Sequence, residues 1–419
     1  VKGFENNGKK ILLSSGKEIE TDLTILSIGV RPENQLAIES GLMIGERGGI
    51  QVNEYLQTND ESIYAIGDAI EVIDFINKQP TMIPLAGPAN RQGRIVANNI
   101  YGKKEGYKGT LGTSVAKIFD YTVATTGNNE KTLKRLGIDY QAIHIHPASH
   151  AGYYPGAFPI ALKLLFNPKT GKILGAQGVG MDGVEKRIDV LATAIKGELT
   201  VFDLTELELA YAPPFSSAKD PVNMAGYVAS NIIDEGIEIV QWHEVDDIVK
   251  NGGLLIDVRE PIEREMGYIE GSINLSLNEL RDRLDEIPMD KEIYVSCQVG
   301  LRGYLATRIL LNNGYKAKNV DGGWKTYSSV YNTCCTHETN SKDVVPAIQI
   351  NTSGLQCPGP IMEVHKNLNN LKQGEVLEII TTDPNFTKDL NGWCEKSGNK
   401  ILKIVEGDKF IKTFIIKGK

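Results

Sequence analysis

Short runs of alternating apolar and polar residues dominate the first half of the chain and predict β-strands. Ser15-Gly16 lies between two of these runs and marks a hairpin turn. The run at 23–28 is almost entirely apolar, which is typical of a parallel strand buried on both faces. The strands that these patterns predict lie at residues 10–19, 21–29, 62–68, 162–166 and 173–177, with further strands and turns over 111–180.

Helix patterns are fewer in this half of the chain. Gly87-Pro88 marks the start of a helix that continues through residues 95–100, because proline fits the first helical turn. Two further helices are expected at 184–200 and 221–234.

Beyond residue 237 the pattern changes to short alternating strands and helices, which predicts a small α/β unit. Its elements are expected as strands at 254–257, 293–296 and 317–320 and a helix around 304–313. Residues 332–345 are polar and unpatterned, which indicates a linker. From residue 348 a βαββ pattern continues to the end of the chain.

Composition narrows the classes of protein that fit. A chain of 419 residues predicts two to four domains at roughly 100–200 residues each. The net charge of -8 argues against nucleic-acid binding, and no apolar run approaches the roughly 18 residues of a membrane helix. Five cysteines are too few for a disulfide framework in a chain of this length, so we expect a reducing, cytoplasmic setting and thiols that are either core residues or reactive. The chain opens on Val1 in what resembles the middle of a β-meander, so we expect the natural protein to be longer.

Gly67-Asp68 ends one of the expected strands and is a candidate ligand contact, since it offers a close backbone approach and a carboxylate. A surface turn explains the same two residues equally well. Two further segments favour the ligand contact over the surface turn: Gly-Val-Arg-Pro at 29–32, and the segment at 84–94. Together the three strings resemble the flavin half of the pyridine nucleotide-disulfide oxidoreductases.

That resemblance implies FAD and NAD(P)H as cofactors. It implies that Gly67 and Asp68 meet the ribityl or pyrophosphate portion of the flavin. It also implies that Leu85, Ala86 and Gly87 place a helix N-terminus near the isoalloxazine, where the helix dipole stabilises the anionic reduced ring. We expect the flavin phosphate loop, the flavin-adjacent cysteine and most of the nicotinamide-binding half to be missing from this chain, and no Gly-x-Gly-x-x-Gly string to follow a strand.

Tyr153 and Tyr211 begin two tyrosine- and proline-containing strings, with a charged helical string at 185–192 between them. From chemistry alone, core tyrosines with satisfied hydroxyls would explain these residues. The strings resemble the dimerisation domain of coenzyme A disulfide reductases and their persulfide-reductase relatives. The resemblance implies a homodimer, coenzyme A as substrate or ligand, and tyrosines that reach the partner's active site as general acids, where other disulfide reductases use a histidine.

Cys297 directly follows an apolar strand and is followed by Gly300 and Arg302. Such a loop turns backbone N–H groups toward the sulfur, and an arginine there would lower the thiol pKa and stabilise a persulfide anion. An inert buried cysteine is the alternative.

Together with the strings at 255–260, 267–274 and 319–324, the Cys297 segment resembles a single rhodanese domain. The short cysteine loop is typical of the sulfur-transferring members. Tyr268 and Glu270 depart from the histidine and proline that many members carry, which affects the scaffold more than the loop.

Cys357-Pro358, followed by Pro360, predicts a cysteine at the start of a helix that continues to residue 371, where the helix dipole favours a thiolate. A plain helix cap is the alternative. With the later strings at 381–384 and 391–394, the segment resembles the TusA/SirA-like sulfur carriers. In that setting Cys394 is expected to be a core residue.

Cys334, Cys335 and His337 lie in the expected linker and are interpreted as untuned thiols, with a relay thiol or adventitious metal binding as the alternative. No cysteine spacing predicts a structural metal, so we expect none.

The fold class expected is therefore a multidomain α/β and α+β chain. Its parts are a partial FAD/NAD(P)-binding region at 1–110, an α+β dimerisation domain at 111–235, a rhodanese α/β domain at 238–331, a linker at 332–345 and a small TusA-like α/β sandwich at 346–419.

The function expected is flavin-dependent, NAD(P)H-linked reduction of coenzyme A disulfide, coenzyme A persulfide or polysulfide. Sulfane sulfur would pass through Cys297 and Cys357, since thiolate attack on an S–S bond is common to all three modules. The partners expected are a second copy of the chain, a small-molecule thiol, disulfide or persulfide, and a sulfur-acceptor protein, with no nucleic acid or membrane. One alternative is a non-redox dimeric sulfurtransferase with a vestigial reductase half. A weaker one is an NADH oxidase, which the tyrosine-rich and sulfur-handling segments oppose.

Overall fold

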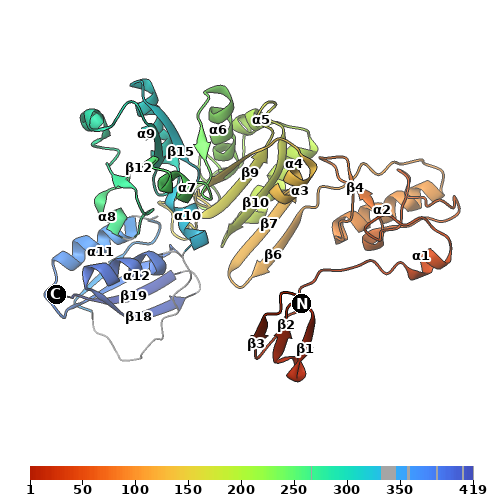
Figure 1. Cartoon of the computed structure of the whole chain (residues 1–419), viewed down its shortest axis with the longest axis horizontal. Coiled ribbons are helices and arrows are strands. Elements are labelled where there is room, and N and C mark those ends of the chain that lie inside the picture. The colour runs from red at the N-terminus through yellow and green to blue at the C-terminus, as the bar shows by residue number, and fades with distance from the viewer. Residues whose placement is uncertain (266, 332–345, 356–358, 384–385, 408–409, 419) are drawn as a thin grey trace. The chain divides into compact units, whose positions relative to one another are not determined.

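The computed structural model describes the chain except residues 266, 332–345, 356–358, 384–385, 408–409 and 419 (Figure 1). The chain forms two compact units. The first comprises residues 1–74 and 78–110, and the second comprises 75–77 and 111–419. In the part of the chain that the structure describes, no helix is long and apolar enough to cross a membrane.

The first unit contains a small antiparallel sheet, a two-stranded ribbon and one long helix. Its elements are β1 (Gly3–Glu5), η1 (Asn6–Gly8), β2 (Lys10–Leu12), β3 (Glu18–Glu20), α1 (Gln35–Glu39), η2 (Gly67–Ala69), β4 (Val72–Ile73), β5 (Pro80–Thr81) and α2 (Ala86–Ile100). The hairpin predicted at Ser15-Gly16 is confirmed between β2 and β3. The helix predicted from Gly87-Pro88 is confirmed as α2, which packs with Leu56, Ile70 and Val72 through Ile95.

Two strands expected in this unit do not form. The apolar residues from Leu23 to Val30 belong to no sheet, and their side chains are between 63% and 87% exposed. A buried parallel strand needs flanking strands to pair with its N–H and C=O groups, and none of the described strands lies beside this segment. At 62–68 only an isolated bridge between Gln57 and Tyr64 forms, before the chain enters η2.

A five-stranded antiparallel sheet forms the centre of the second unit, in the order β6-β7-β10-β9-β8. The strands and the helices around them are β6 (Ser114–Ile118), β7 (Tyr121–Gly127), α3 (Glu130–Leu136), β8 (Gln141–Ile145), β9 (Ile160–Phe166), β10 (Ile173–Gly180), α4 (Val184–Lys196), α5 (Val201–Glu206) and α6 (Pro221–Asp234). The predicted strands at 162–166 and 173–177 and the predicted helix at 221–234 are confirmed. The helix predicted at 184–200 forms as α4 but ends at Lys196. Helix α3 was not expected; Asn129 caps its start and Gly137 ends it in the left-handed conformation.

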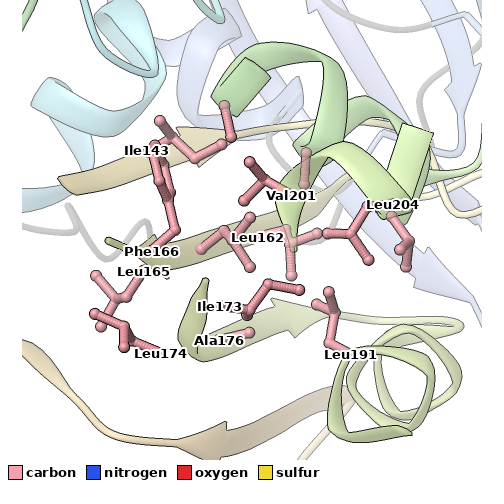
Figure 2. Packing of buried hydrophobic residues seen from close by; sticks show 14 of the residues in the cluster. Ile143, Leu162, Leu165, Phe166, Ile173, Leu174, Ala176, Leu191, Val201 and Leu204 are labelled. Atoms are coloured by element: carbon pink, nitrogen blue, oxygen red, sulfur yellow. The ribbon is translucent and has the colours of Figure 1, made fainter. Parts of the chain in front are cut away.

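Side chains of this sheet and of α4, α5 and α6 form one apolar cluster, part of which is drawn in Figure 2. Leu162 and Leu164 of β9 are buried, as are Val201 and Leu204 of α5. Because successive strand residues point to opposite faces, the alternation along β9 buries one row of side chains under the helices.

Gly178 and Gly180 at the end of β10 and Gly183 before α4 have the Gly-x-Gly-x-x-Gly spacing, so our expectation that no such string accompanies a preceding strand is wrong. A dinucleotide-binding loop follows a parallel strand, whereas β10 pairs antiparallel on both sides. A β carbon at Gly178 would come within 2.8 Å of the Val184 side chain. The glycines therefore serve the close packing of α4 on β10.

A five-stranded parallel sheet follows, in the order β11-β15-β14-β12-β13, and the predicted β/α alternation is confirmed. Its elements are β11 (Ile239–Val240), α7 (Val245–Lys250), β12 (Leu254–Asp257), α8 (Pro261–Glu265), β13 (Ile273–Asn274), η3 (Leu280–Glu286), β14 (Glu292–Ser296), α9 (Leu301–Asn312), β15 (Lys316–Val320) and α10 (Gly323–Tyr331).

The C-terminal part is a four-stranded mixed sheet with two helices, in the strand order β16-β17-β19-β18. Its elements are β16 (Ile348–Asn351), α11 (Gly359–Asn369), β17 (Val376–Thr381), α12 (Phe386–Ser397), β18 (Lys400–Gly407) and β19 (Phe410–Ile416). The expected βαββ order is wrong because it omits α12. Phe386, Leu390 and Trp393 follow a helical spacing and are all buried, which explains the helix. The expected linker at 332–345 lies outside the described residues.

We predict that Leu164→Ala lowers the free energy of unfolding of the antiparallel domain by about 2–5 kcal/mol, because it leaves a cavity among fully buried side chains. Urea unfolding of the whole chain, followed by far-UV circular dichroism, measures the change. Val115→Ala on the exposed side of β6 is the matched control, with an expected change of about 0.5 kcal/mol or less. Equal effects of the two variants would show that this cluster is not the core.

Candidate functional site

Cys297 lies in the turn between β14 and α9 of the parallel sheet. Its side chain is 1% exposed, and the backbone N–H of Gly300 donates to its Sγ at 3.1 Å. Gly300 has φ +101°, a left-handed conformation that turns its N–H back toward the sulfur. Burial alone would also fit the inert-cysteine alternative. The N–H directed at Sγ is the feature expected of a loop that stabilises a sulfur anion.

Backbone hydrogen bonds from the start of α10 hold the Cys297 loop in place. The N–H of Trp324 donates to the carbonyl of Cys297 at 2.7 Å, and the N–H of Lys325 donates to that of Gln298 at 2.9 Å. A β carbon at Gly323 would come within 2.3 Å of the Cys297 carbonyl oxygen, so only glycine permits this approach.

Arg302, on the first turn of α9, is paired with a carboxylate. Its Nη1 and Nη2 each donate to one oxygen of Glu263 at 2.6 Å, and Glu263 is completely buried. Burial alone would lower the pKa of Arg302, but the bonds to Glu263 outweigh it and raise the pKa, with a smaller contribution from a Cys297 thiolate. Arg302 therefore stays charged beside Cys297, and its role in stabilising the persulfide stays a prediction.

Beneath the loop, Arg259 is buried and donates to Asp257 at 2.8 Å and to Gln298 at 3.1 Å. This pair ties the end of β12 to the residue that follows Cys297. Sequence reasoning assigned no contact to Glu263 or Arg259, because the Glu263–Arg302 and Arg259–Gln298 contacts each join residues 39 positions apart.

Tyr153 and Tyr211 are 58 positions apart, and the structure brings their hydroxyls to 3.2 Å. The side chains are 76% and 48% exposed, so the core-tyrosine alternative is wrong. The hydrogen bond with Tyr211 raises the pKa of Tyr153 above the ordinary tyrosine value, at which the hydroxyl is already protonated at neutral pH.

A buried arginine holds the two tyrosine segments together. Nη2 of Arg187 donates to the carbonyl of Ser149 at 2.7 Å and to Asp220 at 2.9 Å, while Ser216 also bonds to Asp220. Ser149 precedes the Tyr153 turn, and Ser216 follows Tyr211 in the chain. Arg187 was missed at the sequence level; its one signal was a charged residue between the buried apolar positions Val184, Ile188 and Leu191 of α4.

The parallel domain also contacts the antiparallel sheet through two histidines of the second unit. His144 pairs with Asp321 at 2.7 Å, and Nε2 of His146 lies 2.7 Å from the Thr326 hydroxyl. Burial, aided by the positive charge of Lys325, lowers the pKa of His146 to about 3. His146 is therefore neutral in the folded chain at any ordinary pH.

In the first unit, the predicted flavin contacts lie on two elements that contact each other, η2 and the start of α2. Gly67 has φ +80° and donates its N–H to the buried Gln92 of α2 at 2.7 Å, so η2 is fixed against the helix. Asp68 is exposed beside it. Gln92 is a further residue that sequence reasoning missed, because an amide on an amphipathic helix gives no local signal.

The start of α2 has the properties that an anionic group of a flavin requires. Leu85 is the residue before the helix and gives no side-chain cap, so the first N–H groups of Ala86 and Gly87 have no partner from it. A β carbon at Gly87 would meet no atom within 4 Å, so the approach to this helix end is open. The open helix start could accept negative charge of a bound FAD, and Asp68 lies exposed beside Gly67, so these residues are compatible with FAD; their assignment to parts of the flavin stays a prediction.

Several predicted thiols are outside the described residues: Cys357, Cys334 and Cys335, together with His337. The core assignment of Cys394 is confirmed, because it is buried in the C-terminal cluster. Over the described part of the chain, no group of three His, Cys, Asp or Glu side chains could hold a metal ion.

Four family models match the chain. They are pyridine nucleotide-disulphide oxidoreductase at 1–93, the dimerisation domain of the same family at 113–221, rhodanese-like domain at 241–329 and sulfurtransferase TusA at 348–418. These matches confirm the predicted resemblances and the predicted mixed α/β multidomain fold class.

Similar proteins include two coenzyme A disulfide reductases. The chain is 40% identical over 224 residues to that of Staphylococcus epidermidis and 41% identical over 224 residues to that of Staphylococcus aureus. Each match covers 53% of this chain and 51% of the relative. The chain thus spans about half the length of the curated relatives it matches.

Two solved structures are also similar. Reduced Bacillus anthracis CoADR-RHD is 62% identical with a TM-score of 0.76, over 79% of this chain and 59% of that one. The NAD-dependent persulfide reductase from A. fulgidus is 42% identical with a TM-score of 0.69, over 75% of this chain and 57% of that one.

We predict that acid weakens the parent chain more than a His146→Gln variant. His146 is protonated below about pH 6.5 in the unfolded chain but only below about pH 3 in the folded chain. The contribution of neutral His146 to the free energy of unfolding is therefore complete above pH 6.5. It is lost as the pH falls, at up to about 1.4 kcal/mol per pH unit. The stability gap between parent and variant should therefore narrow between pH 7.5 and 5 in urea unfolding followed by tryptophan fluorescence. His243→Gln at an exposed histidine is the control, and a gap for His146→Gln that stays constant with pH would contradict this account.

We predict that Arg187→Met lowers the free energy of unfolding by about 3–5 kcal/mol, because it leaves the Asp220 carboxylate buried without its cation. The double variant Arg187→Met with Asp220→Asn removes both charges and should recover much of the loss. Urea unfolding measures both. A double variant no better than the single one would show that packing, not charge, makes Arg187 important.

Proposed function

The chain combines parts of the pyridine nucleotide-disulphide oxidoreductase family with a rhodanese-like domain and a TusA domain, and from this combination we propose a persulfide-handling reductase. In this proposal the chain reduces coenzyme A disulfide, coenzyme A persulfide or polysulfide with FAD and NAD(P)H. Sulfane sulfur passes through Cys297. The coenzyme A disulfide reductase and persulfide reductase relatives support the reductase half, and the rhodanese-like match supports the transfer.

The environment of Cys297 is the observation that carries the transfer step. Its thiolate attacks the outer sulfur of a persulfide R–S–S⁻, and the S–S bond breaks. The thiolate R–S⁻ leaves with the electron pair, and Cys297 becomes a persulfide with no net redox change. The N–H of Gly300, 3.1 Å from Sγ, stabilises the charge on sulfur before and after attack.

Onward transfer to Cys357 repeats the same exchange: a Cys357 thiolate takes the outer sulfur, and the Cys297 thiolate leaves. Cys357 lies outside the described residues, so this step rests on its place in the sequence two positions before the first residue of α11, whose dipole favours a thiolate. The TusA match at 348–418 supports a carrier role for this segment.

The tyrosine pair supplies a proton to the reductive half of the reaction. When a disulfide or persulfide is cleaved by reduction, the leaving thiolate needs a proton, and the Tyr153 hydroxyl carries one at neutral pH, as tyrosines ordinarily do. Both hydroxyls are exposed, as a residue must be if it serves the site of a second chain. The dimerisation-domain match supports a homodimer.

Bound FAD would supply hydride transfer from NAD(P)H. In this chain, Asp68 and the start of α2 orient the group, and the partial positive charge of the helix end balances negative charge there. Gln92 keeps the two pieces together through its bond to Gly67.

A non-redox dimeric sulfurtransferase is the second candidate. It is favoured by the segment from Leu23 to Val30, whose apolar side chains are exposed and pair with no described strand, whereas the Cys297 loop is fully assembled. The two candidates differ in NAD(P)H consumption: purified chain that transfers sulfur without oxidising NAD(P)H in the presence of FAD supports the second.

We predict that Cys297→Ser lowers sulfur transfer from glutathione persulfide to cyanide by at least about 100-fold, since serine lacks the nucleophilic thiolate. Thiocyanate formation measures the transfer. Cys394→Ala, which removes a thiol from the C-terminal core, is the matched control and should keep the activity. Retention of transfer by Cys297→Ser would remove the sulfurtransferase assignment.

A further inference from the structure

The guanidinium of Arg302, five residues after Cys297, has its charge already balanced. Both terminal nitrogens of Arg302 bond to Glu263, one oxygen each, at 2.6 Å. Such a two-pronged pair is among the strongest ionic contacts in proteins. An incoming anion therefore meets an ion pair at this position and not a free cation.

Glu263 has little freedom to release Arg302. Its side chain is completely buried in α8, and its Oε2 also accepts the backbone N–H of Glu260 at 3.1 Å. If Arg302 turned toward a substrate, the carboxylate would be left buried without a cation, which is strongly unfavourable. The pair is therefore a fixed part of the loop's support.

Two neighbouring arginines also bond to an acidic residue, but they share it. Arg259 donates to Asp257 and to the carbonyl of Gly267. Arg264 donates to Asp257 and Ser272. The single Asp257 carboxylate balances only one of these two positive charges, whereas Arg302 has a carboxylate of its own.

The loop also presents an apolar side chain to solvent. Leu301, directly before Arg302 on α9, is 56% exposed. A donor with an organic group next to its sulfur gains contact there, whereas thiosulfate carries only charged oxygens.

We propose that Glu263 is a specificity-determining residue. By neutralising Arg302 it directs Cys297 toward alkyl persulfides, which bring one negative charge or none to the reacting sulfur, and away from dianionic thiosulfate. This inference rests on the proposed role of Cys297 in sulfur transfer and names the class of donor.

Both donors undergo a balanced exchange at Cys297. With an alkyl persulfide, the thiolate takes the outer sulfur and R–S⁻ leaves with the electron pair of the broken S–S bond. With thiosulfate, the thiolate takes the outer sulfur and sulfite leaves with that pair. The difference is charge: a dianion must approach a thiolate, so it depends more on a free cation than a monoanion does.

The experiment compares kcat/KM for thiosulfate with kcat/KM for glutathione persulfide in the full chain. Thiocyanate formation from cyanide is measured, and the rate of Cys297→Ser is subtracted as background. In Glu263→Gln the Arg302 charge is no longer balanced, so the thiosulfate-to-persulfide ratio should rise roughly tenfold. A general loss of folded protein lowers both rates and leaves the ratio unchanged.

Two variants separate charge from structure. Glu279→Gln removes the same charge from the exposed ion pair with Arg283 and should leave the ratio at the parent value. Glu263→Gln combined with Arg302→Met removes both charges and should return the ratio toward the parent value. A ratio that does not rise in Glu263→Gln, or that stays raised in the double variant, overturns the proposal.

The salt dependence gives a second test. If Glu263 neutralises Arg302, kcat/KM for thiosulfate should fall less between about 20 and 200 mM salt in the parent chain than in Glu263→Gln, because salt screens the attraction between the dianion and an unbalanced cation. An equal fall in the two chains overturns the inference. Absence of Cys297-dependent transfer from either donor would instead remove the proposed function on which the inference rests.

Discussion

Gly323 lies directly against the backbone carbonyl of Cys297, where a β carbon would come within 2.3 Å of the oxygen. This approach lets the N–H of Trp324 bond to that carbonyl and fixes the direction in which the chain leaves β14. Gly300 then turns its N–H to the sulfur. The reactive geometry thus depends on two glycines about twenty residues apart, each at a positive φ that other residues adopt only under strain.

The three candidate sites of the chain are organised in the same way. In each one, exposed or loop residues carry the chemistry, and a buried polar residue from a neighbouring helix or strand fixes the loop. Arg187 fixes the tyrosine segments, Gln92 fixes the Gly67 turn, and Arg259 fixes the Cys297 loop. A buried arginine is tolerated in two of these places because a carboxylate lies within 2.9 Å of it. Such contacts hold a loop more rigidly than apolar packing, since they specify direction as well as distance.

The sequence was sufficient for elements whose signal is local. The parallel sheet around Cys297 follows from apolar runs separated by turns, and α2 follows from its proline at the first turn. The residues that fix the loops were not predictable, because the roles of Arg187, Gln92 and Glu263 depend on contacts with residues that are distant in sequence. The apolar run at 23–28 failed for the opposite reason: its local pattern was clear, but a strand forms only when other strands lie beside it. The glycine spacing at Gly178, Gly180 and Gly183 shows that a motif without its parallel strand context reports packing and not a ligand.

A sulfur relay also limits how firmly each position can bind the persulfide. An ion pair with an unbalanced guanidinium would add a full positive charge beside a sulfur anion that must be passed on, and would hold it more firmly than a backbone N–H does. The one donor that meets Sγ of Cys297 among the described contacts is a neutral backbone N–H, while the nearby guanidinium of Arg302 is bonded to Glu263. In the proposed relay, the loop would therefore stabilise the anion enough to form it and leave it free to react with the next thiolate. On this argument the balance between Arg302 and Glu263 serves release as much as selection, because the same charge that would attract a dianion would also retain the product.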